Sequence, residues 1–274
     1  RGSHGRRQVP GGVIVQRRPK AEELIDAALG GQGRPPAVVL AGHNGSGKST
    51  LWYERLAPRL QLPLINADRL LMSILPERDN TGKLPTWAQQ LRDGNSYWAQ
   101  VAQEGVSTFR NLVMQQSMPF AFETVFSYWQ LQDEGTYASK ADDIIAMQAA
   151  GYFVILLFVG LTSPQLSVAR VETRKLKGGH DVPLKSLVQR FPRTQMAVGH
   201  ASSIADMTLM FDNSRDLANA FSLVRAQRKR RVLFDVRDIE YRVSPELRTA
   251  SAPWLEKVCG AWVQRPTAQR RQGG

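Results

Sequence analysis

Cysteine and histidine are scarce in this chain of 274 residues. Cys259 is the single cysteine, which excludes an intramolecular disulfide and favours a cytoplasmic setting. The four histidines are scattered and show no spacing typical of a metal-ligand set. The sequence therefore predicts no metal site built from cysteine and histidine.

Long apolar runs are also missing. The longest one covers residues 152–159, which is too short to span a bilayer. Residues 1–20 contain cations but no apolar core of the length that a secretory signal needs. We therefore expect a cytoplasmic protein with no membrane segment.

Acidic residues are under-represented: 24 aspartates and glutamates face 36 lysines and arginines, and the formal net charge is +12. The cations gather toward the ends of the chain, as in Arg228-Lys229-Arg230-Arg231. Such clusters are typical of solvated, partly mobile segments, but they would also fit a surface for nucleic acid or an acidic partner. A positive field would equally suit an enzyme that acts on anionic substrates.

One stretch organises the chain, namely Gly42-His43-Asn44-Gly45-Ser46-Gly47-Lys48-Ser49, followed by Thr50. It fits G-x-x-x-x-G-K-[ST], the phosphate-binding P-loop, although a chance glycine-rich turn is the alternative. An apolar strand is predicted before it, over 37–41, and a helix after it, over 50–60. In such a loop Lys48 would contact the β- and γ-phosphates of ATP or GTP, and the Ser49 hydroxyl would ligate Mg²⁺.

Strands and helices alternate along the chain. The apolar runs predict strands over 62–65, 119–122, 152–159 and 207–211 in addition to 37–41. Helices are predicted over 21–29, 69–75, 87–116 with an interruption at Asp93-Gly94, 137–150, 164–177, 184–191 and 193–205. After Ser214 the pattern weakens, and we expect a helix over 217–231, one or two strands over 234–243 and a helix over 253–263. The fold class is α/β, a P-loop kinase core with a central, mostly parallel sheet, helices on both faces and a helical lid.

Three regions follow from this pattern. Residues 1–20 are expected to be a flexible basic segment, and residues 21–214 the P-loop domain. Residues 215–274 are expected to be a basic, partly helical extension that packs on the domain or trails from it. In a parallel sheet, ligands bind outside the carboxyl ends of the strands, so the polar residues that follow each apolar run are the candidates for chemistry.

Two carboxylates occupy such positions. Asp68 follows the second predicted strand, beside the expected P-loop strand, and would take the proton of an acceptor hydroxyl; the alternative is a helix N-cap. Glu123 and Thr124 follow the third, where they would bind the acceptor or hold Mg²⁺ through water, unless they are cap or surface residues. Ser127 joins the candidate substrate-binding residues.

A row of cations precedes a glycine pair. Arg170 and Arg174 are four residues apart and share a helix face, and Gly178-Gly179 follows. Arginines on a lid would neutralise the charge that develops on a transferred phosphoryl group. A solvated basic helix face is the alternative.

Several motifs together resemble the zeta-toxin family of P-loop kinases. They are the P-loop, Asn66-Ala67-Asp68, Phe122-Glu123-Thr124, Arg170-Val171, the stretch from Gly178 to Pro183, and Asp212-Asn213-Ser214. The resemblance covers about residues 37–214. It implies an ATP-dependent, Mg²⁺-dependent kinase that phosphorylates the sugar 3′-hydroxyl of UDP-N-acetylglucosamine. It further implies Lys48 as phosphate lysine, Asp68 as base, Arg170 and Arg174 as phosphate clamps, and an inhibitory antitoxin as a possible partner.

The Gly178 to Pro183 stretch is closer to the chromosomal branch of that family than to its plasmid-borne toxins, so the acceptor stays open. A kinase for another small metabolite or nucleotide is the alternative enzyme. A nucleic-acid-binding P-loop protein is the alternative outside the enzymes, since its basic termini would grip a phosphate backbone.

Overall fold

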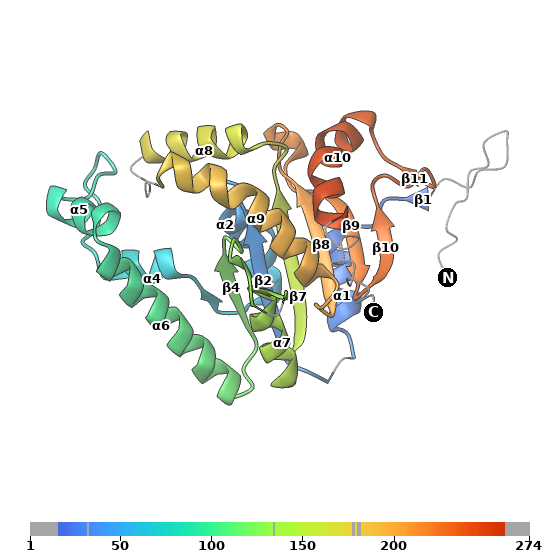
Figure 1. The fold of residues 1–274 in the computed structure, drawn as a ribbon, viewed down its shortest axis with the longest axis horizontal. Coiled ribbons are helices and arrows are strands. Elements are labelled where there is room, and N and C mark those ends of the chain that lie inside the picture. Colours follow the sequence, from blue (N-terminus) through green and yellow to red (C-terminus); the bar gives the residue numbers. More distant parts are fainter. Residues whose placement is uncertain (1–15, 32, 134, 177–178, 180–181, 261–274) are drawn as a thin grey trace, which may run out of the picture.

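The computed structural model describes residues 16–31, 33–133, 135–176, 179 and 182–260. Its centre is a seven-stranded sheet with the strand order β10-β9-β8-β7-β2-β4-β3 (Figure 1). The strands are β2 (Pro36–Gly42), β3 (Leu64–Ile65), β4 (Phe120–Thr124), β7 (Phe153–Gly160), β8 (Met207–Asp212), β9 (Ser222–Arg228) and β10 (Arg231–Asp235). The five strands from β8 to β3 pair in parallel, whereas β9 and β10 are antiparallel. The predicted α/β fold with a mostly parallel sheet is confirmed.

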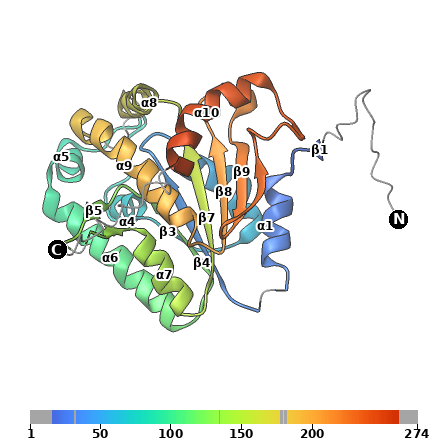
Figure 2. The same ribbon diagram turned by 45° about the vertical axis from the view of Figure 1, so that its right-hand side comes forward.

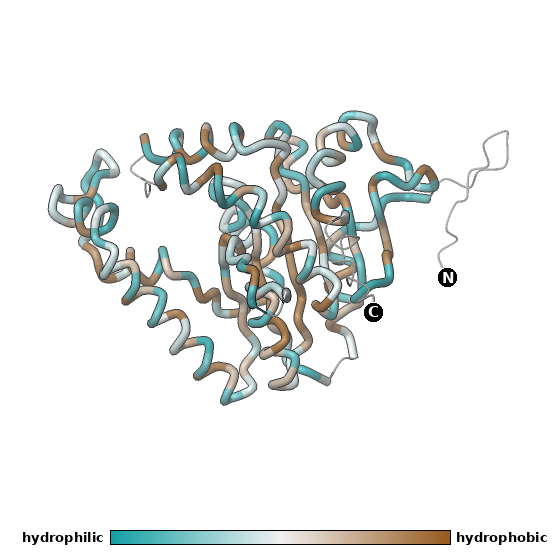
Figure 3. The backbone as a smooth tube through the Cα atoms, in the orientation of Figure 1, coloured by the Kyte–Doolittle hydropathy of each residue, from teal (hydrophilic) through white to brown (hydrophobic). Residues whose placement is uncertain are grey.

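The middle strands are apolar on both faces because helices cover both faces. All eight residues of β7 are buried, and so are Ala37 to Gly42 of β2. The register places Val39 between Phe122 of β4 and Leu156 of β7. Figure 3 shows the same pattern, with hydrophobic strands at the centre and hydrophilic segments outside. Burial on two sides explains why these strands read as continuous apolar runs rather than as alternating patterns.

Helices lie on both faces of the sheet (Figures 1 and 2). One face carries α1 (Ala21–Leu29) and the helix that follows the P-loop, which is divided into α2 (Lys48–Leu51), the π-helical η1 (Trp52–Leu56) and α3 (Ala57–Leu60). The other face carries α7 (Ala141–Ala149), α9 (Leu184–Ser202) and α10 (Pro245–Gly260), while α8 (Pro164–Leu176) packs on α9. Beyond the β3 edge lie α4 (Ala67–Ser73), α5 (Thr86–Gly94) and α6 (Ser96–Gln115).

Two short ribbons and a 3₁₀ turn complete the fold. β1 (Gln16–Arg17) pairs with β11 (Tyr241–Arg242) in parallel, and β5 (Trp129–Leu131) forms a hairpin with β6 (Tyr137–Ser139). The turn η2 (Leu217–Asn219) lies between β8 and β9. Within the described ranges, no helix is long and apolar enough to cross a membrane.

Several local predictions are corrected by the structure. The helix predicted over 217–231 is wrong, because η2 and β9 occupy that segment and Leu223, Val224 and Ala226 are buried in the sheet. The helix predicted from residue 137 begins only at Ala141, after β6. The two helices predicted over 184–205 form the single helix α9, which contains Pro192. The helix predicted over 253–263 begins earlier, at Pro245.

The segment after Ser214 completes the sheet. β9 pairs with β8 from Thr208↔Gln227 to Asp212↔Ser222, and Phe234 of β10 and Trp254 of α10 join the main hydrophobic core. The sequence pattern was weak here because β9 lies between antiparallel partners and carries polar side chains that form specific hydrogen bonds. One example is Gln227, whose amide donates to the carbonyl oxygen of Ser202 at 2.7 Å.

Gly160, at the end of β7, generates a stability prediction. A Cβ atom at this position would lie 2.7 Å from ring atoms of the fully buried Trp254, a separation that real Cβ contacts do not show. We expect Gly160→Ala to lower the free energy of unfolding by about 1–3 kcal/mol, the usual cost of overpacking a core.

The matched control is Gly94→Ala, which makes the same chemical change at the end of α5, where a new Cβ meets no atom within 4 Å. Urea unfolding of both variants and the parent tests the prediction. Equal unfolding midpoints for Gly160→Ala and the parent would show that Trp254 repacks without cost.

Candidate functional site

The P-loop stands at the carboxyl end of β2 and leads into α2, as its motif predicts. Gly45 and Gly47 have left-handed backbones, with φ of 69° and 93°. A Cβ at Gly47 would lie 2.7 Å from Nδ2 of Asn213, and one at Gly45 would lie 3.1 Å from Cβ of Arg170. These positions require glycine both for conformation and for space.

Side chains from two distant segments hold the loop from outside. The Ser167 hydroxyl on α8 donates to the carbonyl oxygen of Asn44 at 2.7 Å. The Asn213 amide, just after β8, donates to the carbonyl oxygen of Ser46 at 2.8 Å. With these carbonyls bound, the loop curvature is held by partners outside the motif itself.

Lys48 is almost fully buried at the start of α2. Its Nζ donates to the carbonyl oxygens of Gly42 and His43 at 3.1 and 3.0 Å and lies 3.8 Å from Oε1 of Glu123. Burial lowers the pKa of Lys48, while the carboxylates of Glu123 and Asp68 oppose that shift. The ammonium group is therefore held inside the loop, beside two carboxylates.

Glu123, at the end of β4, connects three elements. Its carboxylate accepts hydrogen bonds from the Ser49 hydroxyl at 2.9 and 3.1 Å and from Nδ2 of Asn66 at 2.7 Å. Ser49 belongs to α2 and Asn66 precedes α4, so one carboxylate joins the P-loop helix to the β3 edge. A carboxylate next to the P-loop hydroxyl is the arrangement that Mg²⁺ requires when phosphate oxygens and waters supply its other ligands.

Asp68 is exposed in the first turn of α4. The cap of this helix is Asn66, whose side-chain oxygen accepts from the backbone N–H of Arg69 at 3.0 Å, so the N-cap alternative for Asp68 is wrong. The expectation that Asp68 follows a strand beside β2 is also wrong, because β4 lies between β2 and β3. Among the described residues, no hydrogen bond engages the Asp68 carboxylate.

These side chains meet in a cleft of about 310 Å³. Of the predicted site residues, its lining includes Asn44, Gly45, Lys48, Ser49, Asp68, Glu123, Thr124, Ser127 and Arg174. Arg110, Lys140 and Arg190 add three more cations. Cations thus outnumber carboxylates around the cleft, which suits a polyanionic ligand.

Arg170 does not line this cleft. Its Cβ packs at Gly45, and burial lowers the pKa of its guanidinium although the Asp212 carboxylate opposes that shift. The two predicted clamps therefore differ in position, since Arg174 reaches the cleft and Arg170 supports the loop. Of the predicted lid, Gly178, His180 and Asp181 lie outside the described residues, as does Lys177.

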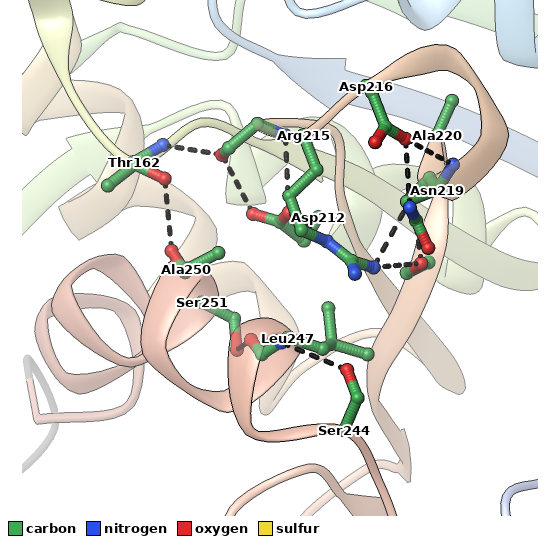
Figure 4. A network of polar contacts seen from close by, with 12 residues as sticks. Thr162, Asp212, Arg215, Asp216, Asn219, Ala220, Ser244, Leu247, Ala250 and Ser251 are labelled. Carbon is green, nitrogen blue, oxygen red and sulfur yellow. Dashed lines mark hydrogen bonds and ion pairs between the residues drawn. The ribbon is translucent and has the colours of Figure 1, made fainter.

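Asp212-Asn213-Ser214 anchors the edge of the site (Figure 4). The fully buried Asp212 carboxylate accepts from Nε1 of Trp254 at 3.1 Å and from the Ser214 hydroxyl at 2.8 Å. Ser214 in turn accepts from the backbone N–H of Thr162 at 2.8 Å. This network ties β8 to α10 and fixes Asn213 against the P-loop.

His43 lies behind the loop rather than in the cleft. Its ring stacks on Phe191 of α9 with centroids 3.8 Å apart and meets the edge of Phe158 at 5.7 Å. Both ring nitrogens are buried, and neither has a hydrogen-bond partner in the part of the chain that the structure describes. Burial, reinforced by the Lys48 charge, lowers the pKa of His43 to about 3, so the ring is neutral near pH 7.

The residues present fit a nucleoside triphosphate and Mg²⁺. The loop and Lys48 provide donors for phosphate oxygens, and Ser49 with Glu123 provides oxygen ligands for the metal. Within the described ranges, no cluster of three or more His, Cys, Asp or Glu side chains could hold a metal without such a ligand.

The parallel sheet, the glycine loop and the cleft define a P-loop α/β fold of the kinase type.

No family model matches the sequence, and no curated protein matches it. Among solved structures, the AvrRxo1-ORF1:AvrRxo1-ORF2 complex with sulphate ions contains a chain that is 14% identical, with a TM-score of 0.53 over 88% of this chain and 82% of that one. The complex with ATP gives 16% identity and the same TM-score and coverage. A chain of the PezAT chromosomal toxin–antitoxin system of Streptococcus pneumoniae is 14% identical, with a TM-score of 0.49 over 89% and 95% of the two chains.

Several residues in and around the cleft are not among the predicted site residues. Arg110 on α6 and Lys140 before α7 both pair with Asp143, at 3.0 and 3.3 Å, and no local motif marks them. Ser167 also went unnoticed, because a serine within a helix has no visible signature. For Asn66, the Asn-Ala-Asp motif was visible, but its role as helix cap and Glu123 partner required the fold.

The neutral His43 ring generates a pH prediction. Between pH 6.5 and about 3 the unfolded chain binds a proton at this residue that the folded chain does not, so its contribution destabilises the fold as pH falls. From pH 7 to 5 this linkage amounts to about 2 kcal/mol. We expect His43→Phe, which keeps an aromatic ring against Phe191, to lose about 2 kcal/mol less stability over that interval. Urea unfolding at both pH values measures this, and equal losses for variant and parent would contradict it.

Proposed function

We propose that this protein is an ATP-dependent phosphotransferase that transfers the γ-phosphoryl group to a hydroxyl of a small molecule. One observation carries the proposal: a single cleft brings together Lys48 and Ser49 of the P-loop, the carboxylates of Asp68 and Glu123, and Arg174. A protein that only binds nucleotides needs the loop, whereas transfer also needs a base and cations around the acceptor.

Each residue has a proposed task. Lys48 exchanges its carbonyl partners for phosphate oxygens of ATP or GTP. Ser49 and Glu123 hold Mg²⁺, which neutralises phosphate charge when bound. Asp68 accepts the proton of the acceptor hydroxyl. At the same time the hydroxyl oxygen bonds to the γ-phosphorus, and the bond from that phosphorus to the leaving nucleoside diphosphate breaks. Arg174 and Arg190 offset the charge on the phosphoryl group in transfer.

For the acceptor, we propose a nucleotide sugar, with the sugar 3′-hydroxyl of UDP-N-acetylglucosamine as the first candidate. The resemblance of the motifs to the zeta-toxin family supports this choice, and so does a cleft in which Thr124 and Ser127 offer hydroxyl groups. Another small metabolite or nucleotide is the alternative acceptor. Incubation with labelled ATP and a panel of nucleotide sugars and nucleotides, followed by mass spectrometry of the products, tests both.

A partner protein is part of the proposal. The chains of similar fold come from an ORF1:ORF2 complex, so a second, inhibitory chain would be in keeping with this architecture.

The nucleic-acid alternative predicts binding to random-sequence DNA that weakens steeply with salt and does not depend on Asp68.

Lys48 generates the first functional prediction. We expect Lys48→Ala to slow phosphoryl transfer by about 10²-fold or more, because a preorganised charge is removed from the phosphate site. Lys257→Ala, at an exposed position on α10, is the matched control and should transfer at the parent rate. Single-turnover assays with labelled ATP measure both, and near-parent turnover by Lys48→Ala would contradict the kinase proposal.

The second functional prediction concerns Asp68 and distinguishes the phosphoryl-transfer step from nucleotide binding. Asp68→Asn removes the basicity but keeps the shape, and it spares the helix cap because Asn66 provides that. We expect ATP affinity to stay within about threefold while single-turnover transfer falls by about 10²–10⁴-fold, the usual contribution of a general base.

Asp133→Asn, in the exposed turn between β5 and β6, is the control. Transfer at the parent rate by Asp68→Asn would rule out this base and leave Glu123 as the remaining candidate. Because that carboxylate already binds Ser49 and Asn66, it would have to exchange partners to act.

A further inference from the structure

A large cavity lies away from the cleft. It has a volume of about 930 Å³ and is bounded by residues 16–22, by the P-loop helix and by β8, β9 and β11. Of the described residues, none lines both this cavity and the cleft that contains Lys48 and Asp68. Its volume falls within the range of small-molecule sites.

Several cations line this cavity. They are Arg17, Arg18, Lys20, Arg55 and Arg242, and Glu22 is the one carboxylate among the described lining residues. A smaller hollow of about 460 Å³ adjoins it through Arg18, Arg55 and Arg242 and adds Arg215. Some of these charges are engaged, since Arg17 pairs with Glu23 at 3.1 Å and Arg55 donates to the carbonyl oxygen of Ala220 at 3.1 Å.

Arg18 and Arg215 differ in how far their charges are satisfied. Among the described residues, no hydrogen bond or ion pair reaches the half-buried Arg18. Burial lowers its pKa, and the nearby Arg215 guanidinium lowers it further. Arg215 is already engaged, since it donates to the Ser222 hydroxyl at 2.7 Å and its Nε forms an ion pair with Oδ2 of Asp212 at 4.0 Å. Asp212 offsets the charge of Arg215, whereas Arg18 has no such partner among the described residues, so an anion bound beside Arg18 would offset its charge.

The interior of the cavity is apolar. Leu51, Leu56, Phe211, Phe221 and Leu223 line it, and all five are buried. Two backbone irregularities lie at this wall: the P-loop helix forms a π turn over Trp52–Leu56, and Phe221 has a left-handed φ of 54°. A π turn and a strained bulky residue both occur preferentially at functional sites.

We propose that this cavity binds a phosphate monoester with an aromatic or apolar body, at a site distinct from the cleft. The guanidinium groups would hold the phosphate by paired hydrogen bonds. A phosphate monoester carries close to two negative charges at pH 7, so it matches a lining with several cations better than a single carboxylate does. The apolar body would cover the leucine and phenylalanine side chains.

The probe for the test is 1-naphthyl phosphate, whose binding is followed by its fluorescence. We expect saturable binding by the full chain, and at least about tenfold weaker binding of 1-naphthol and of inorganic phosphate, because each retains only half of the recognised features. Equal binding of naphthol and naphthyl phosphate would overturn the role of the arginines.

Variants locate the site. Arg18→Gln should weaken naphthyl phosphate binding about tenfold or more, the effect of losing a charged hydrogen bond. Arg231→Gln, an equal change of charge at an exposed position on β10 outside both hollows, should leave it within about twofold. Arg242→Gln, on β11 opposite Arg17 in the β1–β11 pairing, provides a second test if Arg18→Gln folds poorly.

Lys48→Ala separates the two sites, because it damages the P-loop and spares the cavity. Retained probe binding in Lys48→Ala together with loss in Arg18→Gln supports the proposal, whether or not the protein transfers phosphate. Loss in Lys48→Ala with retention in Arg18→Gln would overturn it and assign the probe to the cleft.

Discussion

The parallel pairing of β2 between β4 and β7 is the constraint on which the rest of the structure depends. β2 is buried on both faces between these neighbours, and at its carboxyl end the chain turns through the P-loop into α2. The same pairing places Glu123 at the end of β4 beside Ser49. Without this register, the loop would have the right sequence but no carboxylate next to its hydroxyl.

Neighbouring segments then hold the loop in shape. Ser167 and Asn213 bind carbonyl oxygens of the loop, and Asp212 ties the Asn213 segment to Trp254 of α10. His43 fills the space behind the loop as a neutral ring between Phe158 and Phe191. The phosphate site is thus preorganised by polar bonds on one side and by aromatic packing on the other, which is the condition under which fixed donors stabilise developing charge well.

The excess of positive charge has two distinct structural settings. In the cleft, cations face the carboxylates of Asp68 and Glu123 around Lys48. In the large cavity, cations such as Arg18 and Arg242 line a space together with buried leucine and phenylalanine side chains. The basic run at 228–231 belongs to neither setting, since it forms the β9–β10 turn at the sheet edge. The positive net charge of the chain is therefore the sum of cations on three separate surfaces.

The sequence by itself determined the P-loop, the central strands and the alternation of strands and helices, because buried parallel strands and glycine turns have strong local signatures. It also placed Lys48, Ser49, Asp68 and Glu123 at strand ends, where the structure brings them into one cleft. Tertiary structure alone decided that β4 lies between β2 and β3, that Asn66 rather than Asp68 caps α4, and that Arg174 rather than Arg170 reaches the cleft. It also decided that residues 222–235 join the sheet. The physical reason is that these features depend on which distant segments pair and pack, and local propensity carries no information about such partners.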